Sequence, residues 1–137
     1  MALRFLVDTS VLRRLRHDEV REVIEPLAER GELGRPSICD LEVGYSARNA
    51  SEWDELITAL DAFARVETSA DHVARALQVQ RLLAERSKRG RKIPDLLVAA
   101  AAEELSISVL HYDTDFDLIA AVTGQASQWV VPAGTID

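Results

Sequence analysis

The stretch Phe5–Ser10, with the sequence FLVDTS, places a short apolar run directly before one acidic and two hydroxyl residues. A run this short that ends abruptly in polar residues is typical of a buried strand in an α/β protein. Asp8 then lies at the carboxyl end of the strand, where open α/β sheets bind their ligands. Thr9 or Ser10 can cap a helix that continues to Leu15. An aspartate here is also compatible with a helix-capping role alone, so its function depends on the residues that join it.

Apolar runs and amphipathic segments alternate along the rest of the chain. Further strands are predicted at 34–38, 65–67, 107–112 and 129–131. Helices are predicted around 20–28, 40–45, 51–63, 69–88, 94–105 and 116–122. This alternation predicts an α/β fold with a mainly parallel sheet. The 137 residues contain no linker or internal repeat and are expected to form one domain, 1–137.

Local signals add detail to this prediction. Pro36 suggests an edge strand or the start of a strand, and Ser51 with Asp54 resembles a capping box. The helix at 69–88 is expected to bury one apolar face, formed by Val73, Ala76, Leu77, Leu83 and Ala84. A second apolar stripe consists of Trp53, Leu56, Ile57, Leu60 and Phe63. We expect it to be part of the hydrophobic core more than part of a protein–protein interface.

Charge and residue types exclude several classes of protein. The chain has 16 basic and 23 acidic side chains and a net charge of −7. This argues against a protein that coats nucleic acid non-specifically, because phosphate affinity comes from Lys and Arg; an enzyme with one local basic strip is still compatible. The single Cys39 excludes an internal disulfide and a cysteine-based metal cage. The longest apolar stretch, 96–102, is too short to span a membrane and no secretory signal is recognisable, so we expect a cytoplasmic protein.

Five carboxylates occupy equivalent places in the predicted alternation. Each follows a strand or begins the next helix: Asp8, Glu42, Asp95, Asp113 and Asp115. Singly, each has a simpler explanation as a helix-start, turn or surface residue. Together they are expected to meet at one edge of a parallel sheet, where like charges about 4 Å apart repel by roughly 4 kcal/mol at an effective dielectric near 20. Such a cluster needs protonation or a divalent cation, and carboxylates suit Mg²⁺ or Mn²⁺. The histidines lack ligand spacing and are predicted to be surface or filler residues: His17, His72 and His111.

Four segments resemble, in order, the four acidic motifs of PIN-domain nucleases. They read FLVDTS, CDLEVGYSAR, KIPDLLVAAAAEEL and VLHYDTDFDLI. The similarity is greatest to the VapC-type toxins of toxin–antitoxin operons and covers essentially the whole chain. It implies a PIN-like fold, a twisted, mainly parallel sheet of about five strands flanked by helices, with Mg²⁺ or Mn²⁺ in an acidic pocket. It also implies endoribonuclease activity on structured RNA such as tRNA or rRNA. The implied partners are a second copy in a homodimer and a small VapB-like antitoxin, in a heterotetramer or larger assembly.

The resemblance assigns roles position by position. The acidic quartet of the family matches Asp8, Glu42, Asp95 and Asp113. Asp115 matches a further acidic position used by some members, and Thr9 matches a hydroxyl that hydrogen-bonds a metal-bound group. Two positions depart from the pattern: Ser46 replaces a frequent glycine, and Tyr112 replaces a small polar or basic residue. Neither departure removes a carboxylate.

The implied chemistry is metal-assisted hydrolysis of a phosphodiester. The expected direct or water-bridged metal ligands are Asp8, Asp95 and Asp113, while Glu42 completes the shell or helps to deprotonate the attacking water. A phosphatase needs Asp-x-Asp after the first strand, and a receiver domain needs paired upstream acids and a late lysine; neither pattern is present. The other alternative is a catalytically silent PIN-like scaffold that only binds a partner. It predicts eroded acids, whereas all four positions are filled.

A basic segment directly precedes Asp95. It contains Arg86, Lys88, Arg89, Arg91 and Lys92. Basic residues near a helix end also favour the helix dipole, but Gly90 breaks this helix and lets the segment turn toward the acids. We expect the segment to bind phosphates beside the cut and so to position RNA without reading its sequence. Three residues of the first helix are expected to assist: Arg13, Arg14 and Arg16.

Overall fold

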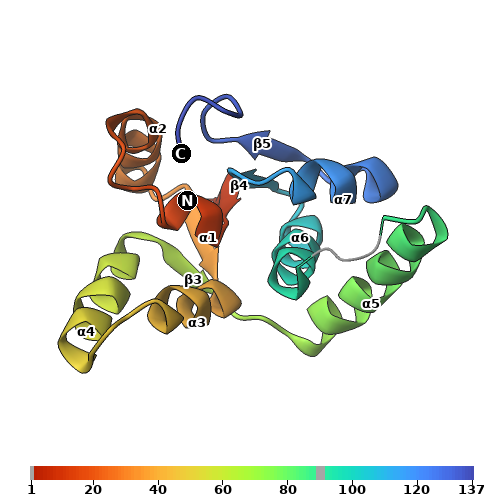
Figure 1. Ribbon diagram of the computed structural model, residues 1–137, viewed down its shortest axis with the longest axis horizontal. Coiled ribbons are helices and arrows are strands. Elements are labelled where there is room, and N and C mark those ends of the chain that lie inside the picture. The colour runs from red at the N-terminus through yellow and green to blue at the C-terminus, as the bar shows by residue number, and fades with distance from the viewer. Residues whose placement is uncertain (1, 89–91) are drawn as a thin grey trace.

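The computed structural model describes residues 2–88 and 92–137. A five-stranded sheet runs through the centre of these residues (Figure 1). Its strands are β1 (Phe5–Val7), β2 (Leu33–Pro36), β3 (Ala64–Val66), β4 (Ser108–His111) and β5 (Ser127–Trp129). They are ordered β3-β2-β1-β4-β5, and every pair is parallel. The predicted α/β fold with a mainly parallel sheet of about five strands is therefore confirmed.

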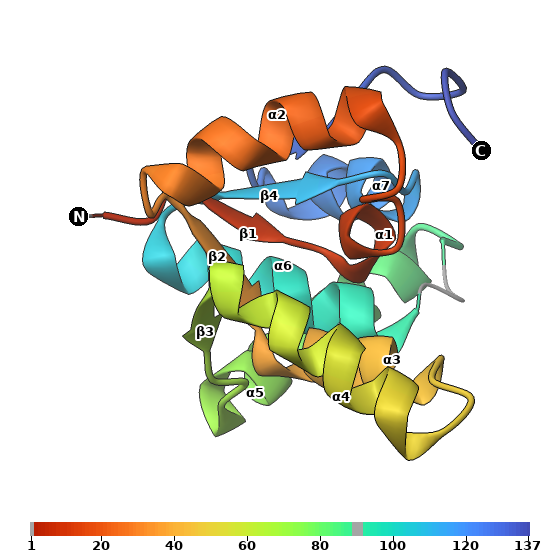
Figure 2. The same ribbon diagram turned by 90° about the vertical axis from the view of Figure 1, so that its left-hand side faces the viewer.

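Helices cover both faces of the sheet. The described helices are α1 (Thr9–Leu12), α2 (Asp18–Glu29), α3 (Ser37–Tyr45), α4 (Ala50–Ala59), the 3₁₀ turn η1 (Leu60–Ala62), α5 (Ala70–Glu85), α6 (Ile93–Leu105) and α7 (Asp115–Thr123). In Figure 2, α2 lies along one side of β1 and β4, and α6 lies on the other. The chain passes from β1 outward to β2 and β3, then returns to β4 on the opposite side of β1. This reversal makes a topological switch point between β1 and β4, where the crevice of an open α/β sheet forms.

Small and branched side chains let α6 approach the sheet closely. The helix buries Val98 and the four alanines Ala99–Ala102, and it packs between the sheet strands β1 and β4 and the helices α5 and α7. Pro94 lies in its first turn, as predicted, where a missing N–H costs nothing. This packing fixes the start of α6 beneath the carboxyl end of β1.

The beginning of the first helix differs from the prediction. Asp8 itself is the N-cap of α1, and its Oδ2 accepts a hydrogen bond of 2.9 Å from Ser10 N. The helix ends at Leu12 and does not reach Leu15. Pro36 does not mark an edge strand: β2 lies between β1 and β3, and Pro36 is its last residue and the N-cap of α3. The proline is tolerated because the strand stops there.

Two helix predictions were wrong in detail. Ser51 and Asp54 form no capping box; Asn49 caps α4 by accepting a hydrogen bond of 2.9 Å from Glu52 N. The expected face of α5 is only partly correct: Ala76 and Leu83 are buried, but Val73 and Leu77 are 49% and 62% exposed, and Ala84 is exposed as well. Packing on α6 and α7 selects a neighbouring strip of the helix, which buries His72, Ala76, Val79 and Leu83. The predicted start of this helix at residue 69 is confirmed: Ser69 is its N-cap, and the side chain of His72 completes a capping box. In the expected core stripe, Leu60 and Phe63 are buried but Trp53 is largely exposed.

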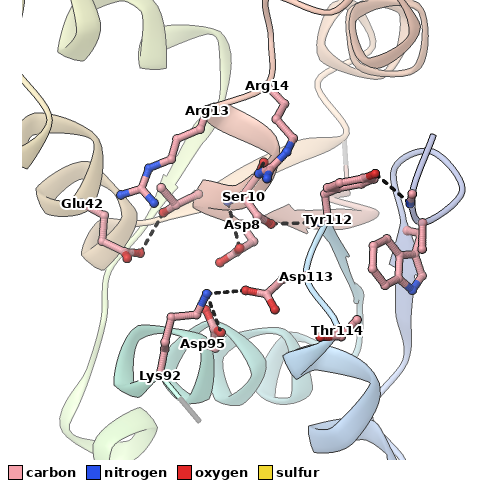
Figure 3. A pocket seen from close by; sticks show the side chains of 14 residues that line it. Asp8, Ser10, Arg13, Arg14, Glu42, Lys92, Asp95, Tyr112, Asp113 and Thr114 are labelled. Atoms are coloured by element: carbon pink, nitrogen blue, oxygen red, sulfur yellow. Dashed lines mark hydrogen bonds and ion pairs between the residues drawn. The ribbon is translucent and has the colours of Figure 1, made fainter. Parts of the chain in front are cut away.

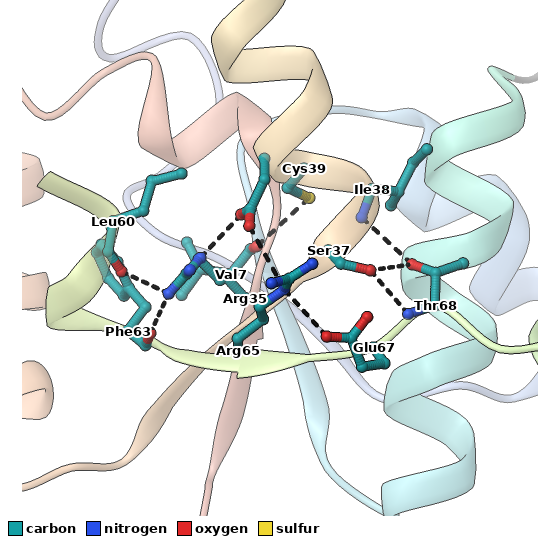
Figure 4. A network of polar contacts seen from close by, with 11 residues as sticks. Val7, Arg35, Ser37, Ile38, Cys39, Leu60, Phe63, Arg65, Glu67 and Thr68 are labelled. Atoms are coloured by element: carbon teal, nitrogen blue, oxygen red, sulfur yellow. Dashed lines mark hydrogen bonds and ion pairs between the residues drawn. The ribbon is translucent and has the colours of Figure 1, made fainter. Parts of the chain in front are cut away.

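A buried arginine anchors the start of α3 (Figure 4). Arg35 donates from Nε to Asp40 Oδ1 at 2.8 Å, and from one terminal nitrogen to the carbonyl oxygens of Leu60, at 2.7 Å, and Phe63. Thr68 N donates to Ser37 Oγ at 2.9 Å on the other side of the helix start. These bonds tie α3 to η1 and to the segment after β3. They fix the direction of α3, which carries Glu42 one turn further on.

Candidate active site

The carboxyl ends of β1 and β4 and the first turn of α6 border a pocket of about 540 Å³. Figure 3 shows acidic side chains converging on it from these three elements and, for Glu42, from α3. Its lining includes four of the five predicted acids: Asp8, Glu42, Asp95 and Asp113. It also includes Thr9, Lys92 and Tyr112. The fifth, Asp115, lies close by at the start of α7. The structure thus brings the predicted acids together, while their catalytic roles stay predictions.

Asp8 forms the floor of the pocket. The residue is 2% exposed, and its Oδ1 has no hydrogen-bond partner among residues 2–88 and 92–137. Burial raises the pKa of Asp8, and the nearby carboxylates of Glu42 and Asp113 raise it further. Hydrogen bonds from Ser10 lower this pKa but do not outweigh the burial. A buried carboxylate oxygen without a partner is costly and calls for a proton or a cation.

Asp95 faces Asp8 from the first turn of α6. It is 4% exposed, and its Oδ2 likewise lacks a hydrogen-bond partner within the described ranges. Burial raises the pKa of Asp95 to about 8, with a further contribution from the charge of Asp8 that Lys92 partly offsets. The side chain of Asp115 also hydrogen-bonds Asp95 and favours its protonated form. Asp95 is therefore the acid of the pocket that most readily keeps its proton in the metal-free protein.

Asp113 behaves differently because it is paired. Its Oδ1 accepts a hydrogen bond of 2.9 Å from Asp115 N, and its Oδ2 accepts one from Lys92 Nζ. Burial acts to raise the pKa of Asp113, but the hydrogen bonds from Lys92 and Asp115 outweigh it, so the pKa is lowered. Asp113 is therefore ionised across the physiological range. His111, buried two residues earlier, accepts a hydrogen bond of 3.2 Å from Asp113 N and helps to fix this turn.

Glu42 approaches the pocket from α3. Its Oε1 accepts a hydrogen bond of 2.8 Å from Thr9 Oγ1, which links the second acidic motif to the first. Cys39 Sγ lies within 4.8 Å of carboxylate oxygens of Asp8 and Glu42. Burial raises the pKa of this thiol, and the neighbouring carboxylates raise it further, so the thiol stays protonated. The available donors at the site are carboxylate oxygens.

This donor set fits a hard divalent cation. Oxygens of Asp95, Asp113 and Asp115 lie within 4.8 Å of one another, close enough to share one ion. The carboxylates of Asp8 and Asp95, each with one oxygen that has no hydrogen-bond partner in the described part of the chain, supply buried charge that such an ion would neutralise. Carboxylate oxygens without thiolate or imidazole donors favour Mg²⁺ or Mn²⁺.

The predicted basic residues are dispersed. Arg13 and Arg14 line the pocket, and the guanidinium of Arg14 stacks over the Tyr112 ring at 4.8 Å. Arg16 instead pairs with Asp137 at 3.2 Å. In the basic segment, Arg86 donates to Ala121 O at 3.3 Å and Lys88 is exposed. Arg89, Gly90 and Arg91 lie outside the described residues. Lys92 lies within the acidic pocket.

Two contributions to the site were not anticipated. Lys92 was expected to bind RNA, yet its side chain contacts the carboxylates of Asp95 and Asp113. Its spacing from Asp95 in the sequence does not indicate where this side chain points. Tyr112, noted only as a departure from the family pattern, binds the C-terminal segment: its hydroxyl donates to Ile136 O at 2.8 Å and accepts from Gly134 N at 2.9 Å. Its backbone N donates to Ser10 Oγ at 2.9 Å and joins β4 to α1. The histidines were predicted to be surface or filler residues, but His72 and His111 are buried and hydrogen-bonded, and His17 is half-buried.

A parallel sheet with acids at the switch point and a further acid at the start of α6 defines the PIN class of α/β domains. The family model described as "PIN domain" matches residues 5–122, and the chain belongs to this family. Within it, the chain belongs to the VapC group. It is 65% identical to Ribonuclease VapC51 of Mycobacterium tuberculosis over all of both chains, and 44% identical to Ribonuclease VapC21 of the same species over 98% of this chain and 99% of that one. The resemblance inferred from the four motifs is confirmed.

Solved structures agree on the fold. The structure of VapBC2 from Rickettsia felis bound to a DNA fragment from its promoter superposes with a TM-score of 0.76 at 17% identity, covering 94% of this chain and 98% of that one. DNA-bound VapBC from Salmonella typhimurium gives 0.77 at 14% identity, covering 94% and 99%. None of the helices in the described ranges is long and apolar enough to cross a membrane.

Proposed function

We propose that the protein is a Mg²⁺- or Mn²⁺-dependent endoribonuclease that acts as the toxin of a toxin–antitoxin pair and cuts structured RNA, tRNA or rRNA. The observation that carries the proposal is a pair of buried carboxylate oxygens, one on Asp8 and one on Asp95, that have no hydrogen-bond partner among the described residues. The ribonuclease names of its VapC relatives support the reaction class. We expect the protein to act in the cytoplasm, where these RNAs occur.

The side chains divide the work. Asp95, Asp113 and Asp115 would hold the cation, with Asp8 adding a direct or water-bridged ligand from the floor of the pocket. A divalent cation supplies charge neutralisation at the phosphate and a more acidic water. Glu42 has one oxygen fixed by Thr9, which leaves the other free to accept a proton from the attacking water. Arg13, at the rim of the same pocket, is placed to bind a phosphate of the RNA.

A small antitoxin would silence this site. The solved relatives named VapBC are toxin–antitoxin assemblies, which supports a VapB-like partner and a homodimer within a heterotetramer or larger complex. A cationic side chain of the antitoxin would replace the charge of the metal, and the ammonium of Lys92 is an example of a side-chain cation that the acids accept. Co-expression with the neighbouring small gene is expected to yield a stable, inactive complex. A well-tolerated and fully active enzyme expressed without any such gene would contradict this part of the proposal.

Cleavage-site mapping on total RNA tests the enzyme directly. The wild-type protein is expected to cut at discrete positions with Mg²⁺ or Mn²⁺ and to stop in EDTA. Asp8→Asn and Asp95→Asn are expected to abolish cleavage while keeping the fold, and exposed Asp54→Asn in α4 serves as the matched control with full activity. Full cleavage in EDTA, or by both pocket variants, would refute the proposal. Tight metal uptake without cleavage by the wild type would favour the silent scaffold.

A further inference from the structure

Lys92 places a cation among the acids that would hold a metal. Its Nζ donates to Asp113 Oδ2 and lies 3.9 Å from Asp95 Oδ2. The lysine side chain is 60% exposed, whereas its partners are largely buried. An ion pair between exposed groups contributes little, but here the acidic half is in the low-dielectric wall of the pocket, where an attraction is less screened.

The backbone of Lys92 is fixed while its side chain is free to move. Lys92 is the N-cap of α6, and its carbonyl oxygen accepts hydrogen bonds from Asp95 N at 3.1 Å and Leu96 N at 3.4 Å. The lysine is therefore attached to the helix that carries Asp95. Its long aliphatic side chain can swing away without moving the acids.

A carboxylate oxygen that is hydrogen-bonded to the ammonium of Lys92 is less available to bind a metal ion. Asp95, Asp113 and Asp115 are the residues whose oxygens lie close enough to share one ion, and the ammonium occupies one oxygen of Asp113. A divalent cation on this set would meet both the occupied oxygen and the repulsion of a positive charge a few ångströms away.

We propose that Lys92 is a tethered counter-ion that stabilises the acidic pocket in the metal-free protein and competes with the divalent cation for Asp95 and Asp113. This inference rests on the metal site of the proposed function. The lysine raises the cation concentration at which the site fills, so the enzyme becomes active only when free Mg²⁺ or Mn²⁺ is sufficient. Metal binding and the lysine ion pair compete for the same carboxylates, so each weakens the other by the same factor.

Calorimetric titration of the full chain with Mn²⁺ tests the exchange without relying on activity. Lys92→Met is expected to bind Mn²⁺ about tenfold more tightly than wild type, the scale of one charge-assisted hydrogen bond. Lys92→Arg, which keeps the charge, is expected to stay within about threefold of wild type. Lys88→Met removes the same charge from an exposed side chain four residues earlier and is the matched control, with a change of about twofold or less.

Thermal unfolding provides the second measurement. In EDTA, Lys92→Met is expected to melt below wild type because the acids have lost their counter-ion, and Mn²⁺ is expected to raise its melting temperature by more than it raises that of wild type. Lys92→Gln replaces Lys92→Met if the latter does not fold. Mn²⁺ affinity in the lysine variant that is unchanged or weaker would overturn the proposal. Wild-type protein that binds Mn²⁺ without cutting RNA would refute the nuclease but not the counter-ion, and wild-type protein that binds no Mn²⁺ would refute both.

Discussion

Thr9 Oγ1 donates a hydrogen bond of 2.8 Å to Glu42 Oε1, across 33 residues of sequence. Thr9 is buried in α1 directly after Asp8, and Glu42 projects from α3, which Arg35 holds in place. The bond therefore fixes one carboxylate oxygen of Glu42 relative to the floor of the pocket. Because the carboxylate is rigid and planar, this bond also restricts where the second oxygen of Glu42 can lie.

Replacing Thr9 with valine tests this role. Thr9→Val keeps the shape but removes the donor, so Glu42 is less well oriented and RNA cleavage is expected to fall about tenfold, less than the roughly 10²–10⁴-fold lost when a proton acceptor is removed altogether. Stability is expected to fall by about 1 kcal/mol, as for a part-buried hydrogen bond. Thr9→Ser keeps the hydroxyl and is the control, with cleavage near wild type. Equal cleavage by the valine and serine variants would show that Thr9 does not act through Glu42.

The same residues show what a sequence can and cannot predict. Strand ends and helix starts are local signals, so the topological rules place Asp8, Asp95 and Asp113 at one sheet edge before any coordinates are known. The direction of Lys92 and the buried position of Arg35 depend on partners far along the chain. Arg35, for example, donates to Leu60 and Phe63 carbonyls that no periodicity indicates.

Helix α5 shows the same limit in its packing. The sequence predicts the helix and its start at residue 69, but the helix carries two apolar strips. The neighbours α6 and α7 decide that Val79 and not Leu77 is buried. A sequence specifies the strips, and only tertiary packing selects between them.

The metal-free protein is expected to lose stability between about pH 6.5 and pH 8. Asp95 has an unfolded pKa near 3.8 and a folded pKa raised to about 8, so its contribution is present at low pH and is lost as pH rises through the folded value. Burial lowers the pKa of His111 from 6.5 to about 4, which makes stability rise with pH below 6.5 and opposes Asp95 there. Above 6.5 the aspartate acts without this opposition. One proton of difference corresponds to about 1.4 kcal/mol per pH unit.

Urea unfolding in EDTA at pH 6, 7 and 8 measures this loss. Asp95→Asn cannot ionise and is expected to flatten the decline, whereas Asp54→Asn is expected to retain it. Saturating Mn²⁺ is expected to reverse the decline in wild type, because the ionised carboxylates then bind the cation. A decline of the same slope in Asp95→Asn would assign it to another group.

Arg35 is expected to be among the most sensitive positions of the fold. Arg35→Met leaves Asp40 without its buried partner and removes the donor to the carbonyl oxygens of Leu60 and Phe63. A cost of about 3 kcal/mol is expected from breaking a buried charged network on one side. Arg65 lies 3.8 Å from the same Asp40 but is 56% exposed. Arg65→Met is therefore the matched control, with a change of about 0.5 kcal/mol or less in chemical denaturation; equal effects would refute the anchoring role of Arg35.

The basic segment before Asp95 is expected to bind backbone phosphates of the RNA. The substitutions Lys88→Glu, Arg89→Glu and Arg91→Glu in one variant leave Lys92 in place, so the acidic pocket and its Mn²⁺ affinity are expected to be preserved. RNA binding is expected to weaken for all sequences alike, because bonds to phosphates position RNA without reading its bases. The slope of log affinity against log salt is expected to become shallower by about 0.7 for each phosphate that the variant no longer binds.

Filter binding from low to high salt measures this slope. Arg4→Glu, at the opposite end of β1, is the control for an added negative charge away from the pocket. An unchanged affinity and slope in the triple variant would mean that these side chains are only the solvated end of α5.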